Sequence, residues 1–305
     1  MADSYGIRPA GYRLPDRTHI GTVRLQVADL ERSLEYYQQV LGLRVLSRAP
    51  QQAALGAAGD TRPLVELFEQ RGVQPVPRGG LLGLYHFAVL LPDRAALGRF
   101  VAHLSALGVH AGSADHAVSE AIYLTDPDGL GIEVYSDRPR AAWRSDSTRQ
   151  LFMTTAPLDV RGVVAAAGGE AWTGMPPGTT MGHVHLHVGD LGAAEAFYHR
   201  ALGFDKVVWT YPGALFLSAG GYHHHLGTNT WSAGPPAGDR HARLLSWDLV
   251  VPRRIDAETA ARSLADAGHA PAATKDAFTV ADGWGTPLRI VAEDSSPSEL
   301  KEITS

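Results

Sequence analysis

Three consecutive histidines, His223 to His225, lie in the stretch GYHHHLGTNTW, deep inside the chain. Imidazole side chains bind metal ions and carry protons near neutral pH, so this run is consistent with a metal site, a catalytic base or a hydrogen-bonded polar cluster. A second group, His183, His185 and His187, alternates along GHVHLHV and therefore shares one face of a predicted strand. Which of these histidines meet depends on the elements that carry them.

The composition limits the chemistry that is available. The 305 residues include no cysteine, which excludes disulfides, thiolate metal sites and cysteine nucleophiles. The formal net charge is −5 and no run of lysine or arginine occurs, which argues against a nucleic-acid surface. The N-terminus has no apolar signal segment, and no stretch approaches the ~18 apolar residues that span a bilayer. We therefore expect a cytoplasmic protein that binds neither nucleic acid nor membranes.

The chain repeats itself. VADLERSLEYYQQVLGL (residues 27–43) and VGDLGAAEAFYHRALGF (residues 188–204) share Val, Asp, Leu, Tyr, Leu and Gly at a constant offset of 161. Each segment follows an alternating strand, passes an Asp that can cap a helix, and ends at a Gly that can stop it. The pattern predicts a strand followed by a helix in both halves of the chain.

A second, weaker pair of repeats raises the number of units to four. YHFAVLLPDRAALGRFVAHLSALG (85–108) and LSWDLVVPRRIDAETAARSLADAG (245–268) match at an offset of 160, and short β-like runs such as GIEVY and LRIVA follow the helices. The pattern predicts an α+β protein in which a βαβββ module occurs four times. The predicted organisation is as follows: residues 1–145 hold an N-terminal pair of modules (about 20–80 and 84–140), 146–180 a linker, and 181–305 a C-terminal pair (about 181–232 and 244–293).

Several motifs in this order make the chain resemble the vicinal oxygen chelate superfamily, which holds glyoxalases, antibiotic-resistance proteins and type I extradiol dioxygenases. The motifs are DLERSLEYYQQVLGL, LYHFAVLLPDR, DPDGLGIEVYSDRPR, GHVHLHVGDL and LFLSAGGYHHHLGTNTW. The closer resemblance is to bacterial catechol 2,3-dioxygenases with four modules. It implies two cupped mixed sheets and an Fe(II)-dependent cleavage of a catechol by O₂ in aromatic catabolism, giving a 2-hydroxymuconic semialdehyde. It also implies that metal ligands come from the first and last strands of the modules.

The four modules differ at these ligand positions. The first-strand positions hold Thr22, His86, His183 and Ser246. The last-strand positions hold Glu66, Glu133, a residue close to His224, and Arg289. The placement of Arg289 follows from the alignment of DPDGLGIE with DGWGTPLR.

Two module pairings give two different metal sites. If consecutive modules pair, the first half offers Glu66, His86 and Glu133, and the second half offers His183 near an arginine that would repel a cation. If the second module pairs with the third, His86, Glu133 and His183 form the 2-His-1-carboxylate set of non-haem Fe(II) oxygenases, with Mn(II) as an alternative metal. The second pairing departs from the one usual in extradiol dioxygenases, and both stay open at this point.

The resemblance also implies the acid–base residues. Type I extradiol enzymes place a tyrosine ten residues before the carboxylate ligand and a histidine further upstream, which predicts catalytic roles for Tyr123 and His116. Their acid–base histidine lies on the closing strand of the module that donates the first histidine ligand. Alignment of HHLGT with that strand favours His224, whose pKa would suit proton transfer from a catechol.

Four further side chains are predicted to contact the substrate: His185, His223, His225 and Trp231. His185 and His187 remain alternatives to His183 as ligand, because they share its face. If GYHHHL were a regular strand, His223 and His225 would face one side and His224 the other.

Two other functions fit the same modules. A glyoxalase-type isomerase or transferase with Zn²⁺, Ni²⁺ or Mn²⁺ would use four protein ligands including two carboxylates, whereas the predicted site has one. A non-catalytic protein that sequesters an aromatic drug would need no metal. The expected partners of the main hypothesis are a small aromatic diol and O₂, and exposed edge strands favour a homo-oligomer. The sequence does not specify which catechol is cleaved.

Overall fold

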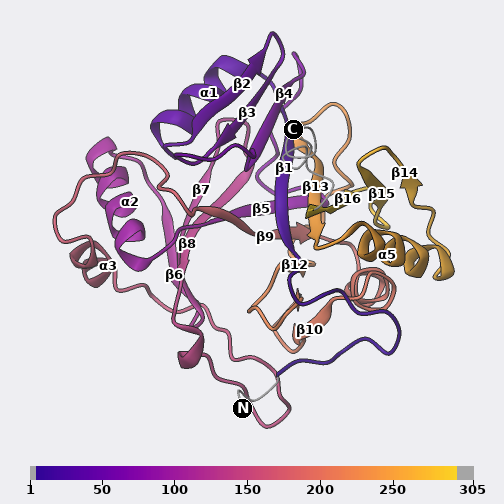
Figure 1. Cartoon of the computed structure of the whole chain (residues 1–305). Helices are drawn as coiled ribbons and strands as arrows, with labels where there is room; N and C mark the ends of the chain where they lie inside the picture. The colour runs from indigo at the N-terminus through magenta and orange to yellow at the C-terminus, as the bar shows by residue number, and fades with distance from the viewer. Residues whose placement is uncertain (1–4, 294–305) are drawn as a thin grey trace, which may run out of the picture.

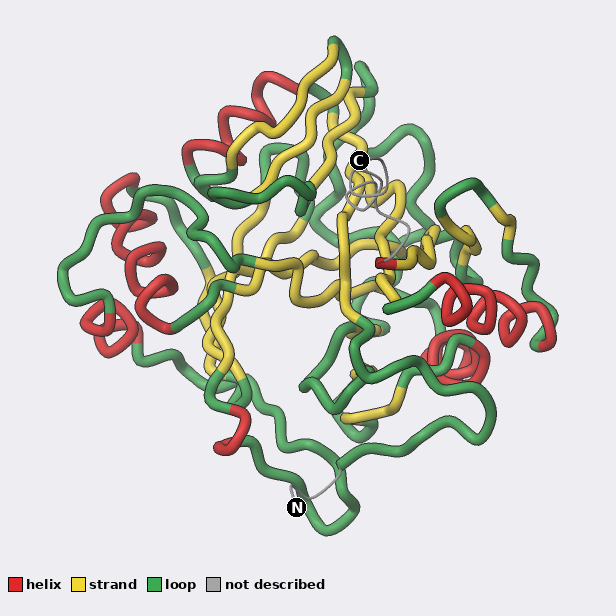
Figure 2. The backbone as a smooth tube through the Cα atoms, in the orientation of Figure 1, coloured by secondary structure: helices red, strands yellow, loops and turns green. Residues whose placement is uncertain are grey.

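Four βαβββ modules follow one another in the computed structural model, which describes residues 5–293. They build two eight-stranded mixed sheets, which confirms the predicted α+β class. The helices lie at the periphery and the strands in the interior (Figures 1 and 2). Most of the buried apolar side chains form one continuous core between these layers.

The first sheet combines the first module with the fourth, in the strand order β14-β15-β16-β13-β1-β4-β3-β2. The first module comprises β1 (His19–Val27), α1 (Leu30–Gln39), β2 (Arg44–Ala49), β3 (Gln52–Gly56) and β4 (Val65–Glu69). The fourth comprises β13 (Arg243–Val251), α5 (Arg254–Asp266), β14 (Ala272–Ala273), β15 (Ala277–Ala281) and β16 (Pro287–Ala292).

The second sheet combines the second module with the third, in the order β10-β11-β12-β9-β5-β8-β7-β6. The second module comprises β5 (Gly83–Leu90), α2 (Arg94–Leu107), β6 (Gly112–Asp115), β7 (Ser119–Thr125) and β8 (Gly131–Asp137). The third comprises β9 (Thr180–His187), α4 (Leu191–Ala194) with a following π-helical segment (Glu195–Ala201), β10 (Asp205–Val208), β11 (Ala214–Ser218) and β12 (Leu226–Asn229). Each sheet therefore takes one module from each half of the chain.

The segment between the halves is not a plain linker. A short 3₁₀ turn (Arg140–Ala142) follows β8, and α3 (Val160–Ala166) packs beside α2 at the outer flank of the second sheet (Figure 1). Within residues 5–293, no helix is both long and apolar enough to cross a bilayer.

The repeated aspartates cap helices as the sequence predicts. The carboxylate of Asp29 accepts a hydrogen bond from the Arg32 backbone N–H at the start of α1, and Asp190 does the same for Ala193 at the start of α4. Such a side chain satisfies one of the free N–H groups in the first turn. The α1 face that includes Tyr37 is buried against the core.

Two buried Tyr–Asp hydrogen bonds tie the two sheets together. The Tyr37 hydroxyl on α1 donates to Asp126 Oδ2 at 3.1 Å, and the Tyr198 hydroxyl in the third module donates to Asp282 Oδ2 at 2.8 Å. Each aspartate begins a turn, and its other carboxylate oxygen, Oδ1, accepts hydrogen bonds from two backbone N–H groups of that turn. Burial raises the pKa of Asp126 to about 7, and it also raises the pKa of Asp282.

We predict that Asp126→Asn removes part of the pH dependence of stability. The folded-state pKa of Asp126 is raised, so its contribution is fully present below the unfolded-state value and is lost as the pH rises through about 7. Between pH 6 and pH 8, wild-type unfolding free energy should fall by about 1 kcal/mol more than that of the variant, whose amide mimics the protonated acid. Urea denaturation at both pH values measures this difference. Identical pH dependence in the two proteins would contradict the prediction.

Candidate metal centre and active site

The register of three strands brings one glutamate and two histidines together. Strand β5 pairs antiparallel with β9 and parallel with β8, and Ala88 is the partner of both His183 and Glu133. His86 lies two residues before Ala88 and shares its face, whereas Phe87 and Val89 point into the hydrophobic core. The alternation of apolar and polar residues along β5 therefore fixes which side chains face the site.

The three side chains are buried and converge on one point. His86 Nε2 lies 3.0 Å and His183 Nε2 lies 3.1 Å from Glu133 Oε2. One ligand atom from each residue lies within 4.8 Å of the others, and all three residues are at most 4% exposed. Among residues 5–293, this is the one group of three or more metal-ligating side chains arranged in this way.

The protonation states of the group suit a cation. Burial lowers the pKa of His86 and of His183 below the ordinary value, although Glu133 opposes this effect. Burial alone would raise the pKa of Glu133, but His183 and His86 beside it hold that pKa well below the usual range. The site thus offers two neutral imidazoles and one carboxylate, the states in which these residues bind metals.

A divalent metal ion fits these residues. His86 Nε2 is buried and, despite its short distance to Glu133, has no hydrogen-bond partner in the described part of the chain. A buried polar atom without a partner is costly unless something else satisfies it. Coordination by His86, His183 and Glu133 would satisfy it, and this donor set is the facial arrangement of non-haem iron sites.

In the second sheet, the last strand of the third module could supply one more ligand, but this position holds a glycine. Glu133 pairs with the residue two after His86, and the equivalent pairing in the third module joins His185 to Gly227. The aligned position, predicted to lie close to His224, is therefore Gly227. A Cβ at Gly227 would lie 2.8 Å from the His185 ring, so the ring occupies the space of the missing side chain. One coordination side is left without a protein ligand.

The first sheet has the same register but no metal group. Its equivalent positions are Thr22, Ser246 and Arg289, and Glu66 occupies the fourth. The guanidinium of Arg24 lies 2.7 Å from Glu66 Oε2 and 2.6 Å from Asp248 Oδ1. Glu66 is thus neutralised by Arg24, and the site expected from chain-order pairing is not assembled.

A cavity of about 330 Å³ opens beside the His–Glu–His group. Its walls come from both modules of the second sheet and from the segment after β8. The lining residues are Tyr85, His86, His116, Tyr123, Glu133, Met153, Thr154, Thr155, His183, His185, Tyr211, Phe216, His224 and Trp231. The cavity is therefore lined mainly by aromatic rings, together with Glu133 and two threonines.

The predicted catalytic residues Tyr123 and His116 both line this cavity. Tyr123 is the partner of Glu133 across β7 and β8, and its hydroxyl lies 2.6 Å from His116 Nε2. His116 Nδ1 donates to the Thr154 carbonyl at 2.6 Å, which fixes the orientation of the ring. Burial, together with the charge of Glu133, raises the pKa of Tyr123 well above its ordinary value, so the phenol stays neutral.

The histidine triplet lies in a loop before β12, which differs from the regular strand assumed in the sequence analysis. Gly220 and Gly221 have φ values of 59° and 64° and turn the chain just before it. The His224 ring lies against His183 at a centroid distance of 4.1 Å and lines the cavity. Burial, with His183 and His223 nearby, holds the pKa of His224 well below its ordinary value.

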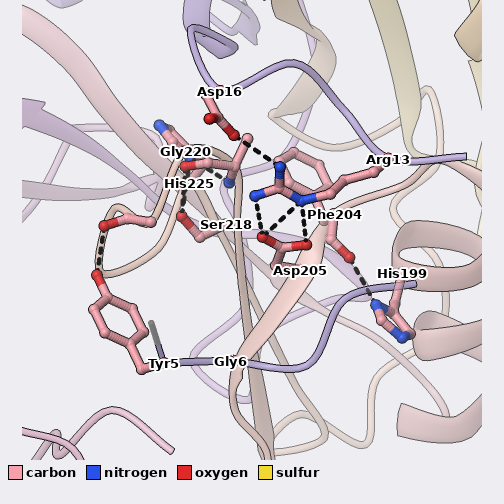
Figure 3. A network of polar contacts seen from close by, with 12 residues as sticks. Tyr5, Gly6, Arg13, Asp16, His199, Phe204, Asp205, Ser218, Gly220 and His225 are labelled. Carbon is pink, nitrogen blue, oxygen red and sulfur yellow. Dashed lines mark hydrogen bonds and ion pairs between the residues drawn. The ribbon is translucent and has the colours of Figure 1, made fainter. Parts of the chain in front are cut away.

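His223 and His225 do not line the cavity, so this geometry does not support their predicted contact with substrate. Figure 3 shows His225 beside Ser218, on the side where the N-terminal segment crosses the third module. Its Nδ1 accepts a hydrogen bond from the Ala219 backbone N–H at 3.2 Å. The same N-terminal segment is fixed by the ion pair between Arg13 and Asp205 at 2.7 Å (Figure 3). His225 therefore belongs to the packing behind the site.

His185 and Trp231 do line the cavity, and both depend on Asn229, which the sequence analysis missed. Asn229 Nδ2 donates to His185 Nε2 at 3.0 Å, and its Oδ1 accepts from the Trp231 backbone N–H at 3.0 Å. The same oxygen lies 2.7 Å from His187 Nδ1. These bonds fix the orientation of the His185 and His187 rings, and the His185 ring lies 5.0 Å from the His86 ring between centroids. The sequence feature that could have identified Asn229 is its position on the last strand of the third module, two residues after Gly227.

Comparison with known proteins relates the chain to one large superfamily. Residues 19–134 and 180–274 match the glyoxalase/bleomycin resistance protein/dioxygenase superfamily. The chain is 45% identical over 269 residues to a protein of Bacillus subtilis (strain 168) named catechol-2,3-dioxygenase, covering 87% of this chain and 94% of the relative.

Two solved structures share the fold at low sequence identity. A putative dioxygenase from Bacillus subtilis has a TM-score of 0.63 at 13% identity, with 92% of this chain and 86% of that chain covered. Glyoxalase I from Zea mays has a TM-score of 0.54 at 17% identity, with 91% and 93% covered. At these identities the similarity concerns the fold alone.

We predict that Glu133→Gln weakens metal binding at least about tenfold, because an amide cannot supply the negative charge that the two neutral imidazoles lack. Calorimetric titration of the metal-free protein with Fe(II), under anaerobic conditions, or with Mn(II) measures the change. Glu66→Gln is the matched control, since Glu66 lies on the last strand of its module as Glu133 does, but pairs with Arg24. An equal loss in both variants would argue against this metal centre.

Proposed function

The chain belongs to the glyoxalase/bleomycin resistance protein/dioxygenase superfamily, and from this premise we propose that it is an extradiol dioxygenase that cleaves a catechol with O₂, using Fe(II). The observation that carries the proposal is the buried group of His86, Glu133 and His183 at the base of an aromatic cavity. The name of its 45% identical relative points to the same reaction.

The residues around the cavity have different proposed roles in metal binding and substrate positioning. Iron held by His86, His183 and Glu133 would bring the diol and O₂ together and acidify the diol hydroxyl groups. Phe216 and Trp231 line the cavity and offer aromatic surface against which the ring of a catechol can pack. Such positioning replaces much of the entropy cost of bringing the reactants together.

His224 is the group placed to move the substrate proton. Its ring lies beside His183 and lines the cavity, and burial keeps it neutral by lowering its pKa, so one ring nitrogen has a free lone pair. The hydrogen-bonded Tyr123–His116 pair lies on the cavity wall next to Glu133 and can stabilise the negative charge that develops on oxygen. Proton return by His224 to the cleaved product completes its role as acid and base, and the product is a 2-hydroxymuconic semialdehyde.

The two rival functions fit the site less well. A glyoxalase-type centre with a second carboxylate has no place for it, because Gly227 occupies the fourth module position and the His185 ring fills the space. A metal-free protein that sequesters an aromatic drug would bury one carboxylate among imidazoles without using it. An iron site with two histidines and one carboxylate explains both the buried Glu133 and the lack of a second carboxylate.

The decisive test is anaerobic reconstitution with Fe(II), followed by catechol and air. We expect a yellow semialdehyde product formed with one equivalent of O₂, and loss of product formation of at least about 100-fold in His86→Ala. Ser246→Ala is the matched control, because Ser246 has the equivalent position in the first sheet. Catechol binding without O₂ uptake would support the drug-binding function instead, and isomerisation of a glutathione hemithioacetal would support the glyoxalase function.

The charge of the cavity also restricts the substrate. No lysine or arginine lines it, and its single carboxylate, Glu133, lies at the base. An adjoining hollow that shares Tyr85 and Trp231 includes Arg78, but this side chain does not line the cavity itself. An anionic substituent on the catechol would lose its hydration without gaining a cationic partner. We therefore propose that the substrate is a catechol with a neutral or no ring substituent.

We predict that kcat/KM for 4-methylcatechol exceeds that for 3,4-dihydroxybenzoate by about 100-fold or more, since an unpaired buried carboxylate is costly. The methyl ester of the acid is the matched control: it has similar size and no charge, so most of the loss should be recovered. Oxygen-uptake kinetics with the three substrates measure the effect. Equal rates for acid and ester would show that charge does not govern selection.

A further inference from the structure

His223 lies directly behind His224 and is fully buried, with its ring packed against Tyr135, Trp143 and Tyr222. A buried imidazole needs hydrogen-bond partners at its ring nitrogens. Both nitrogens of His223 have one. Nε2 lies 2.8 Å from Asp137 Oδ1, and Nδ1 lies 2.8 Å from His224 Nδ1.

The partners determine the direction of each hydrogen bond. A carboxylate accepts only, so His223 carries its proton on Nε2 and donates it to Asp137. When His223 is neutral, its Nδ1 is an acceptor, and His224 donates to it from its own Nδ1. This leaves Nε2 of His224 unprotonated. Within residues 5–293, Nε2 of His224 has no hydrogen-bond partner, and the ring lines the cavity.

Asp137 is itself held in place. Its Oδ1 also accepts a hydrogen bond from the Tyr222 hydroxyl at 3.2 Å, and the hydroxyls of Tyr222 and Tyr135 lie 2.7 Å apart. Asp137 ends β8, the strand that carries Glu133 four residues earlier. One strand thus supplies both the carboxylate of the metal group and the carboxylate at the far end of the histidine pair.

We propose that Asp137 and His223 are positioning residues that hold His224 in the tautomer whose Nε2 lone pair faces the cavity. The inference rests on the proposed function, in which His224 accepts a proton from the bound diol. In the opposite tautomer the ring would present an N–H donor to the diol and could not take its proton. Asp137, acting through His223, thereby determines which ring nitrogen of His224 can accept a proton.

The first test reads the tautomer without any reaction. Full-length protein labelled with ¹⁵N-histidine, metal-free and loaded with diamagnetic Zn²⁺, gives the protonation of each ring nitrogen by NMR, and a His224→Gln spectrum assigns the signals. We expect a proton on Nδ1 of His224 and none on Nε2. A proton on Nε2 in the wild-type protein would overturn the proposal, whether or not catechol is cleaved.

The second test uses two substitutions of His223. His223→Leu removes the acceptor, so we expect a mixture of His224 tautomers and a kcat about ten- to a hundredfold lower, with the KM for catechol within about twofold of wild type. In His223→Asn the amide oxygen can occupy the place of Nδ1 and accept from His224, so tautomer and kcat should largely recover. Unchanged tautomer and kcat in His223→Leu, or an equal loss in both variants, would overturn the proposal.

Two further variants separate positioning from a general loss of packing. Asp137→Asn changes a partly exposed side chain and lets its amide donate to His223, so Nε2 of His224 should become partly protonated. His225→Asn replaces the neighbouring buried imidazole, which does not contact the cavity, and should leave the His224 tautomer unchanged. If the expected tautomer occurs in a protein that cleaves no catechol, the positioning stands and the proposed function fails.

Discussion

The antiparallel pairing of β5 with β9 is the contact on which the site depends, because it is the boundary between the second and third modules. Across it, Ala88 faces His183 and His86 faces His185, while β8 adds Glu133 on the other side of β5. A slip of one residue would turn His86 to the opposite face. The fully buried Phe87 and Val89 oppose such a slip, so the hydrophobic core fixes the geometry of the polar group.

The two sheets differ in how they compensate buried carboxylates. Both place polar side chains on the strands around a module boundary, where burial makes an unpaired charge costly. In the first sheet two arginines, Arg24 and Arg289, balance Glu66 and Asp248. In the second sheet a single carboxylate lies among imidazoles, where a divalent cation would supply the positive charge. The difference between duplicated sheets is thus a difference in where the positive charge comes from.

The sequence predicts those features that depend on periodicity. The repeat offsets give the four modules, and the alignment of DPDGLGIE with DGWGTPLR correctly places Arg289 at the position that Glu133 has in the second module. In the third module the HHLGT alignment points to a residue close to His224, whereas the paired residue is Gly227, which the offset of 161 relates to Glu66; the Gly220–Gly221 turn places the triplet outside β12. The metal that occupies the site and the roles of its residues remain predictions.

Side-chain partners between modules could not be read from the chain in the same way. The adjacent residues His223, His224 and His225 have three different environments because their partners come from different elements: Asp137 from β8, His183 from β9 and Ser218 from β11. No local pattern distinguishes them, since burial and identity are the same for all three. In the proposed function, the position of one carboxylate on β8 is what gives His224 a role that His225 lacks. Because Glu133 and Asp137 both lie on β8, a shift of this strand would displace the carboxylate of the His–Glu–His group and the partner of His223 together.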